Sequence, residues 1–159
     1  MREALTDREK AEFLREHLKY EVEMLNWAIA EIAPVDGGKV SQGQHNAAID
    51  VFCLHARNLV EFLGKDHRES RTREASAKHF TLQGFPANYD RALLERLNSH
   101  CSHLTYRRHS AGDKIGDADF RALCDFLKGE IERFWANLRP AIREALEDLG
   151  QRATTDASN

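Results

Sequence analysis

An apolar repeat near the N-terminus places the strongest constraint on the fold of this chain. Aliphatic side chains recur there at intervals of four, four, three, four and three residues: Leu14, Leu18, Val22, Leu25, Ile29 and Ile32. This is the period of one face of an α-helix. Thr6 and Glu9 have the spacing of a capping box, and Pro34 forces the residue before it out of the α conformation. We therefore predict a helix from Asp7 to Ile32.

Similar patterns predict helices along most of the remaining chain. Residues 44–63 are apolar nearly all round, as in a central core helix. Further helices are predicted over residues 90–106, from Asp117 to an end or kink at Pro140, and over 141–149, closed by Gly150. The polar stretch 64–88 is predicted to be a loop with at most a short helical turn near 72–77.

No alternating strand pattern of useful length occurs, so the predicted fold class is all-α. We expect an antiparallel four-helix bundle with a short fifth C-terminal helix. Residues 1–150 would form this single bundle, and 151–159 a flexible tail.

Composition narrows the setting in which the chain works. With 159 residues, 42% of them hydrophobic and 31% charged, it is typical of one globular domain. No apolar run approaches the roughly 20 residues that span a bilayer, so we predict a cytoplasmic protein without a membrane partner. The three cysteines show no C-x-x-C spacing, which indicates neither a disulfide framework nor a cysteine zinc site.

Charge is distributed unevenly along the chain. The formal net charge of -3 argues against a general nucleic-acid binder. Residues 1–32 and 113–149 each carry a net charge of -3, whereas residues 64–112 carry +4 and five of the eight histidines. A local phosphate-binding site in this middle region is therefore compatible with an acidic total.

The predicted helix over 90–106 concentrates polar chemistry in one column. Arg96, His100, His103 and Arg107 follow one another at intervals of four, three and four residues, so they share a helix face. Arginine offers a planar fork of donors to phosphate oxygens, and histidine can transfer protons near neutral pH. This column could hold an RNA phosphodiester while a histidine moves a proton, with no metal or cofactor required.

Other interpretations of the histidines stay open. Acidic faces of the first and fourth helices could pair with the column and make it a structural network. His100 and His103 could ligate zinc, but the sequence places no further ligand beside them, and we predict no metal. His55 is interpreted as a core histidine, for which the helix over 90–106 can offer a hydrogen-bond partner. Arg57 and Glu61 have the spacing of a surface ion pair.

Two segments resemble a known group of proteins. LHARNLVEFL at residues 54–63 and NSHCSHLTYR at 98–107 are similar to small bacterial helical proteins that in turn resemble HEPN domains. HEPN domains are four- to five-helix bundles that often dimerise. Many are metal-independent endoribonucleases of toxin-antitoxin, phage-defence or CRISPR-linked systems. Their signature is an arginine, four to six further residues and then a histidine.

The resemblance implies roles for particular residues of this chain. Arg96 and His103 are separated by six residues and would be the catalytic pair, with Arg96 on the phosphate and His103 in acid-base work. His100, Arg107 and Asn98 would bind the substrate. The expected partners are RNA, a second copy in a homodimer, and a cognate antitoxin or defence-system protein. The alternative is a non-catalytic helical interaction or dimerisation protein with a structural His/Arg network.

Overall fold

The fold was analysed in a computed structural model, which describes residues 5–32, 40–64, 75–83 and 116–156 together with Phe85, Ala92, Glu95 and Leu97. Within these residues the chain is helical and forms no strand, which confirms the predicted all-α class. None of the helices described is long and apolar enough to cross a membrane.

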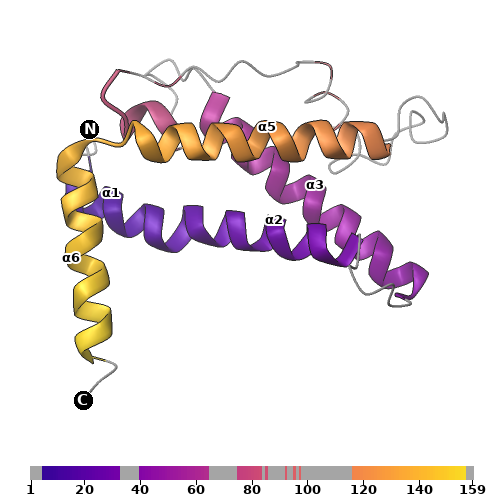
Figure 1. Cartoon of the computed structure of the whole chain (residues 1–159), viewed down its shortest axis with the longest axis horizontal. Helices are drawn as coiled ribbons and strands as arrows, with labels where there is room; N and C mark the ends of the chain where they lie inside the picture. The colour runs from indigo at the N-terminus through magenta and orange to yellow at the C-terminus, as the bar shows by residue number, and fades with distance from the viewer. Residues whose placement is uncertain are drawn as a thin grey trace.

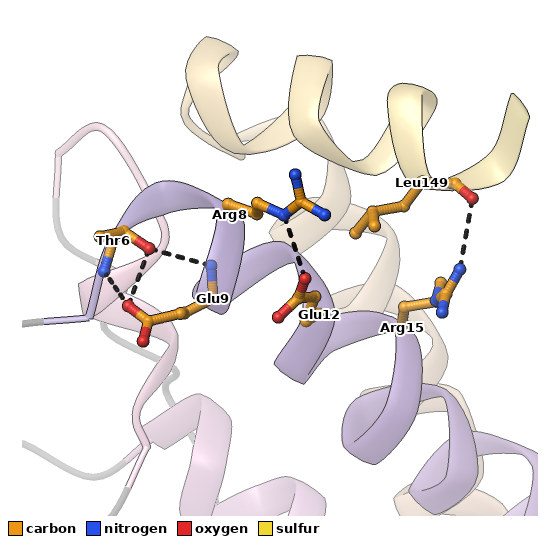
Figure 2. Close-up of polar contacts among 6 residues, drawn as sticks. All are labelled: Thr6, Arg8, Glu9, Glu12, Arg15 and Leu149. Carbon is orange, nitrogen blue, oxygen red and sulfur yellow. Dashed lines mark hydrogen bonds and ion pairs between the residues drawn. The ribbon is translucent and has the colours of Figure 1, made fainter. Parts of the chain in front are cut away.

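The first helical stretch runs from Asp7 to Ile32, as the apolar repeat predicts. It consists of α1 (Asp7–Phe13), a π-helical segment (Leu14–Leu18) and α2 (Lys19–Ile32). The Thr6 hydroxyl accepts a hydrogen bond from the Glu9 amide at 3.2 Å, and the Glu9 carboxylate accepts one from the Thr6 amide at 2.8 Å (Figure 2). The predicted capping box is therefore present.

The π-helical segment was not predicted. Its last turn is closed by the Lys19 amide, which donates to the Leu14 carbonyl five residues earlier. Leu14 and Leu18 are both buried. Their spacing of four residues is close to one turn of either an α-helix or a π-helix. The apolar repeat therefore could not show the wider turn.

The central helix α3 (Gln42–Gly64) begins two residues earlier than predicted. Ser41 and Gln44 form a second capping box: the Ser41 hydroxyl accepts from the Gln44 amide at 3.2 Å, and the Gln44 side chain accepts from the Ser41 amide at 3.0 Å. In Figure 1, α3 runs in the opposite direction to α2 and crosses it at an angle, with the end of α2 beside the beginning of α3. Nine of the 23 residues of α3 are buried, and eight of them lie from Phe52 onward: Ala48, Phe52, Cys53, His55, Ala56, Leu59, Val60, Phe62 and Leu63.

Part of the predicted loop 64–88 belongs to the core. Residues 75–83 contain a 3-10 turn (Ala77–His79), which lies later than the turn predicted near 72–77. Phe80 and Thr81 are 2% and 1% exposed. Thr81 forms an isolated antiparallel bridge with Leu138, in the connection between the last two helices. The loop prediction missed this packing because the buried residues are too few to show a period.

The last two helices are α5 (Asp117–Ala136) and α6 (Pro140–Asp156). Proline 140 was predicted to end or kink a helix, and that prediction is wrong, because Pro140 is the first residue of α6. A proline is tolerated there since the first helical amides have no partner within the helix. The predicted end at Gly150 and the tail from 151 are also too early: the helix continues through Gly150 to Asp156, and residues 157–159 lie outside the described part.

Helix α6 packs against α1 and extends away from α2, α3 and α5 (Figure 1). Ile142 is fully buried and Leu149 is 9% exposed. The Arg15 guanidinium, from the π-helical segment, donates a hydrogen bond to the Leu149 carbonyl at 3.3 Å (Figure 2). An apolar contact and one long-range hydrogen bond thus connect the two ends of the described chain.

Aromatic rings form the centre of the core. Phe134 of α5 contacts Phe62 of α3 at 5.3 Å between ring centroids, and Phe80 and Phe85 at 6.3 and 5.9 Å. These edge-on geometries are the favourable ones for aromatic pairs. The core therefore joins α3, α5 and the 75–85 segment.

Candidate functional site

The predicted catalytic column lies outside the described residues. This applies to Arg96 and His103 and to the predicted substrate-binding residues Asn98, His100 and Arg107. Of the same predicted helix, the structure describes Ala92, Glu95 and Leu97, all three in helical conformation. Leu97 is fully buried, whereas Ala92 and Glu95 are exposed. The catalytic assignment stays a prediction.

A polar cluster that the structure does describe lies between α2 and α3. A Glu21 carboxylate oxygen lies 2.7 Å from His55 Nδ1, and the Asn58 amide donates to that same oxygen at 3.1 Å. The His55 side chain is 6% exposed and that of Glu21 is 24% exposed. A short contact between an imidazole and a carboxylate, largely shielded from water, is in the range of charge-assisted hydrogen bonds.

Helical periodicity positions these three side chains. His55 lies on the face of α3 that also buries Phe52 and Leu59, and Asn58 follows one turn later at the edge of that face. On α2, Glu21 precedes the buried Leu25 by four residues, so its side chain projects from the side of α2 that packs on α3. The Tyr20 ring meets the His55 ring edge-on at 5.6 Å.

The interpretation of His55 as a buried, hydrogen-bonded histidine is confirmed, but its predicted partner is wrong. The partner belongs to α2 rather than to the helix over 90–106. Glu21 was not singled out from the sequence, although one signal was present: it is a carboxylate four residues before a core leucine. The surface ion pair of Arg57 and Glu61 is confirmed at 3.2 Å, with about a third of each side chain exposed.

The cluster can orient an imidazole, and this is the first requirement of both proton transfer and metal binding. The Glu21 carboxylate fixes the ring through Nδ1, while Nε2 makes no hydrogen bond to another described residue. However, no group of three metal-ligating side chains occurs among the described residues, and Cys53, the nearest thiol along α3, is buried. What these residues show is a polar connection between two helices.

Comparison with known proteins adds no family to this description. No protein-family model, no curated protein and no solved structure matches the chain. The similarity to HEPN domains therefore depends on the two short segments quoted above.

Proposed function

We propose that this chain is a cytoplasmic RNA-binding protein that uses the Arg96, His100, His103 and Arg107 column. The proposed architecture around it is the antiparallel four-helix bundle with a further C-terminal helix. One observation carries the proposal: four cationic or titratable side chains follow helical spacing on a segment whose Leu97 is buried and whose Glu95 is exposed. On an ideal helix this column lies about 90° from Leu97, beside the buried face rather than within it.

The proposed activity is metal-independent cleavage of the phosphodiester. The Arg96 guanidinium holds the phosphate oxygens, and His103 accepts the proton of the 2'-hydroxyl. The 2'-oxygen then bonds to phosphorus, the bond from phosphorus to the 5'-oxygen breaks, and the leaving oxygen takes up a proton from water, while the proton on His103 later returns to solvent. His100, Arg107 and Asn98 would position the strand.

Two arginine variants on the same predicted helix test the binding. Arg96→Ala and Arg91→Ala remove the same charge, but on an ideal helix Arg91 lies on the opposite side from the column. We expect the dissociation constant for a labelled single-stranded RNA to rise about tenfold for Arg96→Ala and less than twofold for Arg91→Ala. Equal effects would mean that only the total charge matters, and no binding by the wild type at low salt would refute the proposal.

A histidine variant tests the chemistry. In the presence of EDTA, His103→Ala should leave RNA binding within about threefold and lower the cleavage rate by about a hundredfold or more. Cleavage that persists in the variant would mean that His103 is not the acid-base group.

Two further parts of the proposal have their own tests. A toxin-antitoxin or defence setting predicts that a cognate partner gene lies beside this one. The proposed homodimer predicts twice the chain mass in light scattering.

The second candidate function is a non-catalytic helical interaction protein. The cluster of Glu21, His55 and Asn58 favours it, because this chain already uses a buried histidine to connect two helices. If the predicted column has the same role, His103→Ala should lower the free energy of unfolding by about 1–3 kcal/mol, since a buried partner would be left without its hydrogen bond. No RNA cleavage should then be measurable with the wild type.

A further inference from the structure

Helices α2 and α3 carry three large apolar side chains that are exposed. Tyr20 is 53% exposed, Trp27 46% and Leu54 47%. We refer to these three residues as the seam face, because Tyr20 reaches α3 where α2 packs on it. The ring of Tyr20 contacts His55, the residue after Leu54, and Trp27 follows Tyr20 by two helical turns.

The arrangement of these side chains is that of a helix-binding surface. Isolated exposed apolar residues are normal on any protein and indicate nothing. Here, two aromatic residues lie at i and i+7 on one helix, and a leucine on the next helix directly precedes the histidine that Tyr20 contacts. Tryptophan and tyrosine are the residue types that most often dominate binding energy at interfaces, and apolar anchors one to two turns apart are typical of helix recognition.

The charges around the seam face are negative. Helices α2 and α3 together carry five acidic and two basic side chains, a net charge of -3 with neutral histidines. Both basic groups already lie in ion pairs: Lys19 is 3.6 Å from Glu23, and Arg57 is 3.2 Å from Glu61.

Two further carboxylates flank the apolar residues at helical neighbour distance. Glu31 follows Trp27 by four residues, and Asp50 precedes Leu54 by four. A second copy of this chain would bring the same negative field against itself, which is unfavourable.

We propose that the seam face binds a basic amphipathic helix of another protein. The apolar residues of that helix would cover Trp27, Tyr20 and Leu54, and its lysines or arginines would meet Glu31 and Asp50. This proposal uses other residues than the proposed RNA site and does not depend on it, so the failure of RNA binding would not affect it.

Two designed peptides test the chemistry of the partner. One peptide of about 20 residues carries leucines at helical spacing with lysines elsewhere, and the other carries glutamates in place of the lysines. Binding to the full chain is followed by fluorescence anisotropy of the labelled peptide. The basic peptide should bind at least tenfold more tightly than the acidic one, and added salt should weaken the binding.

Variants of the chain then locate the binding surface. Trp27→Ala should raise the dissociation constant of the basic peptide about tenfold or more, and the double change Glu31→Gln with Asp50→Asn about three- to tenfold. The matched control is Leu82→Ala, because Leu82 is 65% exposed but lies in the 75–83 segment rather than on the seam face. This control should bind as the wild type does.

Several results would overturn the proposal. One is an equal dissociation constant for the two peptides, and another is that neither peptide binds. Another is unchanged binding by Trp27→Ala in a chain whose melting temperature is unchanged. A dimer in sedimentation equilibrium that Trp27→Ala dissociates would make the second copy the occupant.

Discussion

The contact between Glu21 and His55 should be one of the larger polar contributions to the stability of this fold. In Glu21→Leu, His55 loses its 2.7 Å partner at a site where 6% of its side chain is exposed, and Asn58 loses an acceptor. A hydrogen bond to a charged group contributes about 1.5–3 kcal/mol, and a buried group left unpaired costs about 1–3 kcal/mol. We expect the free energy of unfolding to fall by about 2 kcal/mol, which for a chain of this length lowers the melting temperature by about 4–8 °C.

A double-mutant cycle separates this interaction from the loss of single side chains. His55→Phe should also cost about 2 kcal/mol, because it leaves the Glu21 carboxylate without its imidazole. When both groups are replaced, no polar atom of the pair remains unpaired, so the double variant should be about 1–2 kcal/mol more stable than the sum of the single effects predicts.

Urea unfolding followed by circular dichroism measures all three variants. The control is Glu23→Gln, whose side chain is 63% exposed and 3.6 Å from Lys19, and we expect it to change stability by less than about 0.5 kcal/mol. The reasoning would be refuted by additive single effects, or by a Glu21→Leu variant that is no less stable than the control.

Three further measurements test other parts of the structure. Thr6→Ala should lower the free energy of unfolding by about 1 kcal/mol at neutral pH, measured by urea unfolding. Hydrogen bonds from the Thr6 backbone and side chain lower the pKa of Glu9. The part of the difference that depends on the Glu9 carboxylate should therefore vanish as the pH falls through that lowered pKa. Burial, with a smaller contribution from Asp125, raises the pKa of Cys124 to about 11, so mass spectrometry should show iodoacetamide labelling at pH 8 about a hundredfold slower in the native chain than in urea. Ile142→Ala should cost about 2–5 kcal/mol because this side chain of α6 is fully buried, and a loss below about 1 kcal/mol would mean that α6 does not pack on α1 as described.

The limits of a helix could be predicted where the residues that determine them lie close together in the sequence. The repeat from Leu14 to Ile32 and the pair of Thr6 and Glu9 are contained within a few turns, so the limits of the first helical stretch could be predicted. Pro140 was misjudged because the same residue fits either the end of one helix or the first turn of the next, and the contacts around it decide between them.

Tertiary contacts were beyond the reach of the same patterns. The buried state of His55 followed from its apolar neighbours, but its partner is 34 residues away, and helical spacing does not show which helix packs against which face. The core position of Phe80 was missed for the same reason. The column from Arg96 to Arg107 is a prediction from spacing alone, since its residues lie outside the described part.

The π-helical segment has a consequence for how this chain can change in length. A π turn is equivalent to one inserted residue, and it lies between α1, which packs on α6, and α2, which packs on α3. Because the wide turn takes up this extra residue, deleting one residue between Leu14 and Leu18 would restore the ordinary helical pitch and leave the faces of α1 and α2 in nearly their present relation. An ordinary helix of the present length would instead rotate every α2 side chain by about 100° relative to α1, and it could not keep both the packing of α1 on α6 and the packing of α2 on α3.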